Sequence, residues 1–281
     1  GAGRVADELA AGLRAAGDDV VRIVRKARQP EPGVVHVPAL RGEMVLRNLV
    51  HVDLGAAPLL ALLTARRVDV VHFHDHHMAW GIATAEAVAR RWPTLLTFHD
   101  YSGFTGGCMY PRGCERFATG CGACPELGHD ALPLRLDTTR RTWARNASLA
   151  ARPQVRAIAP SAFMARLAEI GAWRGRTVDV VPNGVDTTTF SPNRRAAARA
   201  ARGLSPNDSV LLFVAASLAD PRKGLADLLS ALPPLLSADP NLRVWLVGRP
   251  DGAGPLPHRV EALGSVVGKA ALADLYAAAD L

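Results

Sequence analysis

Short apolar segments alternate along the chain with longer segments in which apolar residues recur every three or four positions. The first kind is typical of buried strands and the second of amphipathic helices. Strands are expected over residues 20–24, 68–73, 94–98, 157–159, 178–181, 210–215, 243–247 and 260–263. Helices are expected over 4–16, 58–66, 78–91 and 133–150, and from residues 161, 225 and 270 onward. Because strands that alternate with helices form parallel sheets, an α/β fold is predicted.

The length and composition favour two domains. The chain has 281 residues, of which 49% are apolar, so each domain is able to bury a core. Residues 187–208 are polar, rich in Arg and interrupted by Pro192 and Pro206, which predicts a linker with a short helix. The predicted organisation is a first domain over 1–186, this linker, and a second, incomplete domain over 209–281. The start within a helical pattern and the end in mid-pattern predict truncation at both ends.

The formal net charge is +7, with 33 Lys and Arg against 26 Asp and Glu. Such an excess favours anionic partners, namely phosphates, a membrane surface or nucleic acid, although the Arg residues are scattered along the chain. No apolar run reaches the ~20 residues that span a bilayer, and no signal peptide is recognised. A cytoplasmic protein is therefore expected, with peripheral contact at the inner membrane face as a further expectation.

Five polar residues lie at or just beyond the ends of predicted strands, namely His72, His74, His99, Ser161 and Asn183. Ligands of parallel α/β sheets bind beyond the carboxyl ends of the strands, so these residues are candidates for a binding site. Since side chains alternate along a strand, at most one of His72 and His74 is expected to face that site. A metal site formed with the neighbouring histidines is the alternative. For Ser161 the alternative is a helix N-cap.

Glycines stand at two further places where a ligand is able to approach the backbone. Gly1 and Gly3 precede the first predicted helix, whose positive end favours an anion, so they are typical of a phosphate-binding turn. Asn183 and Gly184 follow a predicted strand and are expected to shape a hinge, with Gly184 in a turn that needs a positive φ. Plain structural turns are the alternative in both places.

The loop over 219–224 carries Arg222 and Lys223 between a buried strand and a helix that begins at Leu225. Arg offers a two-pronged donor and Lys a compact charge, and the N-terminal end of a helix also favours an anion. The loop is therefore predicted to bind a phosphate group. An exposed basic loop without a ligand is the alternative.

All four cysteines lie in a Gly-rich insertion over 101–130, at Cys108, Cys114, Cys121 and Cys124. The spacing C-x5-C-x6-C-x2-C, with Gly-Ala between the last two, is typical of a metal knuckle. Since disulfides are disfavoured in a reducing cytoplasm, a structural zinc ion is the leading prediction. Free or transiently oxidised thiols, two disulfides and an iron–sulfur cluster are the alternatives.

Several motifs, in their order and spacing, resemble retaining glycosyltransferases of family 4, which have the GT-B fold. They are Gly1–Ala6, Val70–His74, Thr97–Asp100, Pro182–Asp186, Asp220–Gly224, Val247–Gly248 and Leu275–Asp280. Together these motifs are spread over nearly the whole chain. The resemblance implies two Rossmann-like domains that face each other across a cleft, the first on the acceptor side and the second binding the nucleotide sugar.

The resemblance also implies an activity, which is transfer of a sugar from a nucleotide-diphosphate sugar to a glycan, lipid-linked or small-molecule acceptor with retention of configuration. His99 is then expected beside the transferred sugar, while Arg222 and Lys223 neutralise the departing diphosphate without a catalytic metal. The donor and acceptor contacts are assigned to Gly1, Gly3, His74, Ser161, Asn183, Gly184 and Gly248. The family's Glu-x7-Glu pair is expected after residue 281, so this chain is expected to bind donor weakly or to be inactive.

Two other functions stay open at this point. A zinc-containing nucleic-acid-binding protein fits the positive charge and the cysteines. However, the chain lacks a dense basic stripe with interleaved aromatic residues, and only 5% of its residues are aromatic, so no nucleic-acid partner is expected. Another GT-B enzyme, such as a sugar-nucleotide epimerase, is the second alternative.

Overall fold

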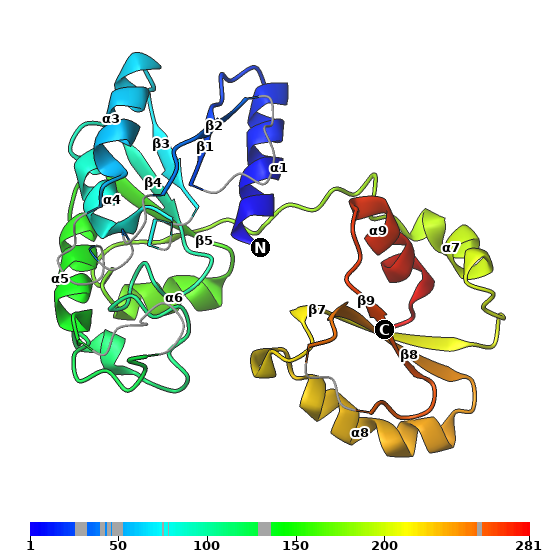
Figure 1. Ribbon diagram of the computed structural model, residues 1–281. Coiled ribbons are helices and arrows are strands. Elements are labelled where there is room, and N and C mark those ends of the chain that lie inside the picture. The colour runs from blue at the N-terminus through cyan, green and yellow to red at the C-terminus, as the bar shows by residue number, and fades with distance from the viewer. Residues whose placement is uncertain are drawn as a thin grey trace. The chain divides into compact units, whose positions relative to one another are not determined.

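The computed structural model describes residues 1–25, 33–39, 43, 46, 53–74, 76–77, 79–128, 136–251 and 255–281. They form two compact units, Gly1–Gly184 and Val185–Leu281, and each is described by itself (Figure 1). Residues 187–208, predicted as a linker, contain the predicted short helix and belong by their contacts to unit 2. In the part of the chain that the structure describes, no helix combines the length and the apolar character that crossing a membrane requires.

The described residues of unit 1 form two parallel sheets. The smaller pairs β1 (Arg22–Val24) with β2 (Val34–His36), a strand that is absent from the sequence-based expectations. The larger has the order β3-β4-β5-β6, with β3 (Val71–Phe73), β4 (Thr94–Thr97), β5 (Val155–Ala159) and β6 (Asp179–Val180). The helices are α1 (Ala2–Ala15), α3 (Ala56–Ala65), α4 (Gly81–Ala89), α5 (Thr139–Ala150) and α6 (Ala162–Ile170), with a 3-10 turn η1 (Arg116–Ala118).

Polar side chains set the start of two of these helices. Ser161 is the N-cap of α6, where its Oγ accepts a hydrogen bond from the backbone N of Met164 at 3.3 Å. Asp137 accepts hydrogen bonds from the backbone N and the Oγ1 of Thr139, at 2.9 and 2.6 Å. Within the described residues, α5 therefore begins at Thr139, although the apolar spacing predicts a helix from residue 133.

Aromatic packing holds the segment that follows β4. The ring of Phe98 lies 5.4 Å, centroid to centroid, from both Phe104 and Trp173 and meets each of them edge-on. All three side chains are at most 2% exposed and belong to the core of the larger sheet. The backbone on either side of His99 is therefore fixed by the core.

Unit 2 is built on one parallel sheet with the order β7-β8-β9. Its elements are η2 (Pro192–Arg194), α7 (Arg195–Ala201), β7 (Ser209–Ser217), η3 (Pro221–Lys223), α8 (Leu225–Ala238), β8 (Leu242–Arg249), β9 (Val260–Gly264) and α9 (Lys269–Ala278). The predicted strands and helices of this region are all present. The predicted α/β fold with parallel sheets is therefore confirmed, and the predicted cleft between the domains stays a prediction.

Helices cover both faces of this sheet, α8 on one and α7 with α9 on the other (Figure 1). The side chains of β8 alternate between the two faces, as strand geometry requires. Val244 and Leu246 belong to the core that includes α8, whereas Trp245 and Val247 belong to the core that includes α7 and α9. The central strand of unit 2 thus contributes to two cores.

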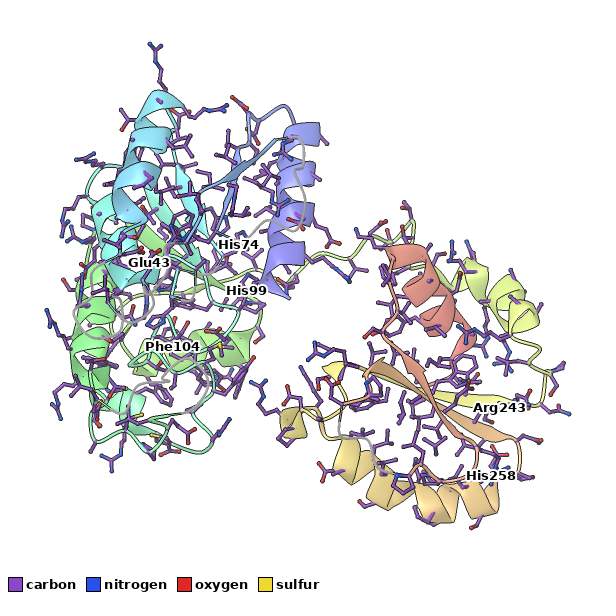
Figure 2. The ribbon with its side chains drawn as sticks, in the orientation of Figure 1. Glu43, His74, His99, Phe104, Arg243 and His258 are labelled. Carbon is purple, nitrogen blue, oxygen red and sulfur yellow. The ribbon has the colours of Figure 1, made fainter. Side chains whose placement is uncertain are left out.

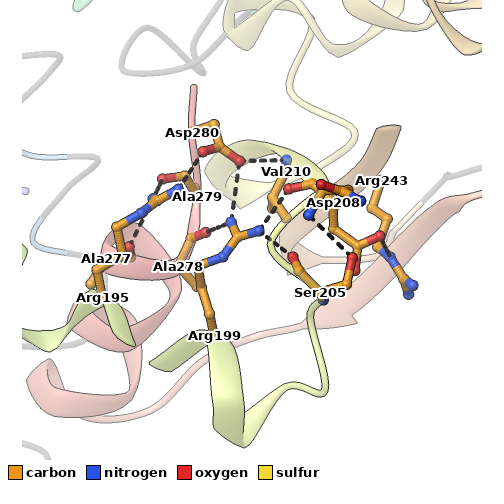
Figure 3. A network of polar contacts seen from close by, with 11 residues as sticks. Arg195, Arg199, Ser205, Asp208, Val210, Arg243, Ala277, Ala278, Ala279 and Asp280 are labelled. Carbon is orange, nitrogen blue, oxygen red and sulfur yellow. Dashed lines mark hydrogen bonds and ion pairs between the residues drawn. The ribbon is translucent and has the colours of Figure 1, made fainter. Parts of the chain in front are cut away.

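A polar network joins α7, the C-terminal segment and β7 (Figure 3). Arg199 donates a hydrogen bond to the carbonyl oxygen of Ala278 at 3.0 Å, and Arg195 forms an ion pair with Asp280. The carboxylate of Asp280 also accepts a hydrogen bond from the backbone N of Val210 at 2.8 Å. These contacts fix α7 within unit 2.

Candidate functional site

Two strand ends that were expected to carry ligand-binding histidines lie side by side in unit 1. β3 and β4 pair in parallel, with His72 opposite Leu95 and Phe73 opposite Leu96, so both strands end at the same edge of the sheet. His74 and His99 lie just beyond those ends, and Nδ1 of His74 is 3.0 Å from Nε2 of His99 (Figure 2). The structure therefore brings two of the predicted site residues into direct contact.

A small pocket of about 40 Å³ lies at this edge. Its lining includes Ala2, His74, His76, His99, Asp100 and Ser102. Gly1 is the N-cap of α1 and Gly3 lies in the first turn of that helix, so the predicted phosphate-binding turn is at the pocket. The partial positive charge of a helix N-terminus favours an anionic group there.

Of the first two histidines, His74 lines the pocket and His72 does not, although both rings lie on the same side of the strand. Residues two apart in a strand share a face, and the ring centroids of His72 and His74 are only 4.3 Å apart. Nε2 of His72 is 2.7 Å from Oγ1 of Thr97, so the ring is held by the neighbouring strand. Among the described residues, no three His, Cys, Asp or Glu side chains are placed to hold a metal ion, so the alternative of a histidine metal site gains no support.

Burial keeps His72, His74 and His76 neutral at pH 7. Burial, and after it the charge of His99, lower the pKa of His72 to about 4. The pKa of His74 is lowered to about 3, first by burial and then by the charges of His72 and His99. Burial lowers the pKa of His76 to about 4, although the carboxylate of Asp100 favours the charged ring. Each neutral ring offers one donor and one acceptor nitrogen.

The loop that follows His99 is held by a turn that the sequence analysis did not single out. Asp100 accepts hydrogen bonds from the backbone N and the Oγ of Ser102, at 2.8 and 2.6 Å. Asn146 of α5 donates to the carbonyl oxygens of Ser102 and Thr105, at 3.1 and 3.0 Å. The available signal was the Asp-x-Ser spacing, which favours such a turn.

The four cysteines lie around a second, smaller cavity of about 20 Å³, and all four are free thiols. Burial raises the pKa of Cys108 to about 11 and that of Cys121 to about 12, so both are protonated at neutral pH. The thiols are therefore neighbours, as their spacing predicts. However, none of the described His, Cys, Asp and Glu side chains form a group of three placed to hold a metal ion, so the predicted zinc site is not supported.

The backbone around the last two cysteines has an unusual conformation. Four successive residues have a positive φ, namely Gly120 at +113°, Cys121 at +55°, Gly122 at +91° and Ala123 at +47°. Two contacts to the start of α5 fix this segment. The backbone N of Gly122 donates to Thr139 Oγ1 at 3.0 Å, and the backbone N of Cys124 donates to Asp137 at 2.9 Å. The insertion is thus a well-fixed part of unit 1.

In unit 2, the predicted phosphate loop forms η3, which directly precedes α8 and includes both Arg222 and Lys223. The guanidinium of Arg222 donates to both carboxylate oxygens of Asp220, at 2.8 and 2.7 Å. Hydrogen bonds from the Arg222 side chain are the main reason that the pKa of Asp220 falls to about 2. An anion that binds Arg222 in the same way therefore has to replace this carboxylate.

The remaining predicted site residues are Gly248, Asn183 and Gly184. Gly248 has φ +151°, and a Cβ there would lie 2.3 Å from the carbonyl oxygen of Ala215, so the packing of β8 against β7 requires glycine. Asn183 and Gly184 are exposed and follow β6. Gly184 is not among the glycines with a positive φ, so the turn predicted for it is wrong.

The fold resembles that of solved nucleotide-sugar complexes. The crystal structure of Anabaena Alr3699/HepE with UDP-glucose is 20% identical and matches with a TM-score of 0.53 over 88% of this chain and 58% of that chain. The structure of the same protein with UDP and glucose is also 20% identical and gives 0.52 over 88% and 59%. The likeness shows the predicted GT-B class of α/β fold with Rossmann-like units.

The sequence assigns the family within that class. Residues 1–189 match the model of Glycosyltransferase Family 4, and the chain belongs to this family, as its motifs predict. D-inositol 3-phosphate glycosyltransferases of Segniliparus rotundus, Rhodococcus opacus and Nocardia farcinica are 38%, 40% and 45% identical over 116, 119 and 86 residues. These matches cover 37%, 37% and 30% of this chain, but only 25%, 26% and 18% of those relatives.

Proposed function

We propose that this chain takes part in transfer of a sugar from a nucleotide-diphosphate sugar to an acceptor, with retention of configuration. The observation that carries the proposal is the contact between His74 and His99 in a pocket at the N-terminal end of α1. This pocket lies within the segment that matches the family. It offers neutral hydrogen-bonding groups beside a helix end that favours an anion.

In unit 1, His99 is proposed to hydrogen-bond the transferred sugar. Gly1 and Gly3 are proposed to bring backbone N–H groups of the first turn of α1 close to a phosphate of the donor or acceptor. Ser161 and Asn183 remain proposed ligand contacts, although the hydroxyl of Ser161 already serves as a helix cap. The Cys-rich insertion is proposed to stiffen the loop after His99 and to shape acceptor entry.

In unit 2, Arg222 and Lys223 are proposed to stabilise the departing diphosphate. When the bond between sugar and phosphate breaks, negative charge grows on the phosphate oxygen while the sugar becomes cation-like. Fixed donors that face this oxygen lower the barrier, and two cationic side chains beside the N-terminus of α8 suit that role without a catalytic metal. Gly248 is proposed to allow close approach of the donor at the end of β8.

Relatives and structural neighbours suggest which substrates to test first. The Anabaena structure contains UDP-glucose, which supports a uridine-diphosphate sugar as donor. The related enzymes are named for D-inositol 3-phosphate, which supports a small phosphorylated acceptor, with glycan and lipid-linked acceptors as further candidates. A cytoplasmic location is also proposed, and the net charge of +7 supports peripheral contact with an anionic membrane face.

The test is a screen of the full-length protein against nucleotide-diphosphate sugars, with and without inositol 3-phosphate and other acceptors. The expected result is release of nucleoside diphosphate that depends on the acceptor, and a product whose anomeric configuration by NMR equals that of the donor. Conversion of the donor into an isomer without acceptor would favour an epimerase. A salt-sensitive gel shift of DNA or RNA, with no sugar transfer, would favour a nucleic-acid-binding protein.

A further inference from the structure

We propose that His74 is a positioning residue for His99, whose ring orientation and tautomer it fixes in the pocket. The inference rests on the proposed function, in which His99 contacts the transferred sugar. Its starting point is the 3.0 Å contact between Nδ1 of His74 and Nε2 of His99. This contact between side chains links the ends of the neighbouring strands β3 and β4.

The ring of His74 is itself fixed from two sides. On one side lies the ring of His72, with its centroid 4.3 Å away, and His72 is held by the 2.7 Å contact of its Nε2 with Thr97 Oγ1. On the other side the ring of His99 lies edge to edge with that of His74, with centroids 5.3 Å apart and an interplanar angle of 23°, as a hydrogen bond between in-plane ring nitrogens requires. Because β3 and β4 are paired in register, the order Thr97, His72, His74, His99 is set by the sheet. His74 is thus a rigid support for His99.

The count of protons at this contact couples the tautomer of His99 to that of His74. A neutral imidazole has one N–H and one bare nitrogen, and a hydrogen bond between two neutral rings contains one proton. If Nε2 of His99 carries that proton, Nδ1 of His99 is an acceptor. If Nδ1 of His74 carries it, Nδ1 of His99 is instead a donor. Either arrangement gives His99 one fixed hydrogen-bonding role toward a ligand.

Three substitutions of His74 separate this role from direct ligand contact. His74→Asn keeps a polar group near the position of Nδ1, whereas His74→Gln keeps one near the position of Nε2. His74→Phe keeps the ring and removes both nitrogens. We expect the Asn variant to retain kcat within about threefold. We expect the Gln and Phe variants to lose kcat by about 10- to 100-fold, with little change in the donor KM.

The order of the variants decides between the two roles. Activity retained by His74→Gln and lost by His74→Asn would show that Nε2 of His74 contacts the ligand, which would overturn the positioning role. Wild-type activity in His74→Phe would also overturn it. Thermal unfolding of each variant identifies any loss that comes from an unfolded protein.

A second measurement needs no substrate. In ¹⁵N NMR spectra of histidine-labelled protein, with His99→Gln for assignment, we expect one tautomer of His99 in the wild type and a mixture in His74→Phe. Identical ring-nitrogen shifts of His99 in both proteins would overturn the inference. If the wild type transfers no sugar, the proposed function fails while this spectroscopic test of the His74–His99 contact still applies.

Discussion

Replacement of Gly248 by alanine tests how closely the strands of unit 2 pack. The added Cβ would lie 2.3 Å from the carbonyl oxygen of Ala215, a distance that real Cβ atoms essentially never show, and that oxygen is backbone. The strands must therefore separate, and overpacking of this kind costs about 1–3 kcal/mol. The φ of +151° adds about 1–3 kcal/mol for a residue with a side chain. We expect Gly248→Ala to lower the free energy of unfolding of unit 2 by about 2–6 kcal/mol.

Gly264→Ala is the matched control because it introduces backbone strain at a positive φ without a steric clash of the added Cβ. Gly264 ends β9 in the same sheet and has φ +71°, but a Cβ there would meet no atom within 4 Å. Its substitution is expected to cost about 1–2 kcal/mol. The assay is urea unfolding followed by hydrogen exchange of peptides from β7 and β8, which reports unit 2 alone. Equal stabilities of the two variants would refute the argument from close packing.

Three further predictions concern charge and protonation. Arg222→Ala and Lys223→Ala are expected to lower kcat of the full-length protein by about 100-fold or more. Arg243→Ala, near the start of β8, is the control and is expected to keep kcat near the wild-type value. Steady-state kinetics measure both effects. The free energy of unfolding of unit 1 is expected to fall as the pH is lowered from 6.5 toward 4. The reason is that the native pKa values of His72, His74 and His76 are about 4, 3 and 4, so the unfolded chain binds more protons than the native chain in this range. The urea midpoint of unfolding, measured against pH, should therefore fall less steeply for His74→Phe than for the wild type. Cys108 and Cys121 are expected to react slowly with iodoacetamide at pH 8, since burial raises their pKa values; faster alkylation after a chelator is added would mean that a bound metal protects them instead.

Local sequence signals predicted most of the elements correctly. The helix from residue 225 follows Gly224, whose φ of +76° allows it to cap a helix, and the helix after Ser161 has the hydroxyl cap that this residue type favours. Both signals act between residues close in sequence. Strand β2 was not predicted because it depends on its pairing with β1, which the local pattern does not contain.

The sequence placed His74 and His99 at strand ends, but it could not show that they touch. Their contact depends on the pairing of β3 with β4, which are more than twenty residues apart. Asp220 and Arg222 are only two residues apart in the sequence. Their ion pair could still not be predicted, because it depends on the geometry of the turn η3. The turn at Gly184 was predicted from residue type alone, and glycine also adopts ordinary φ values.

The alternation of side chains along β8 makes unit 2 sensitive to changes in chain length. Deletion of one residue between Leu242 and Trp245 would shift the rest of the strand by half a repeat and exchange the side chains that face α8 with those that face α7 and α9. Trp245, with its large ring, would then face the helix α8, and both apolar layers would be disrupted at once. Substitutions in this strand are therefore expected to be tolerated more readily than any single-residue insertion or deletion.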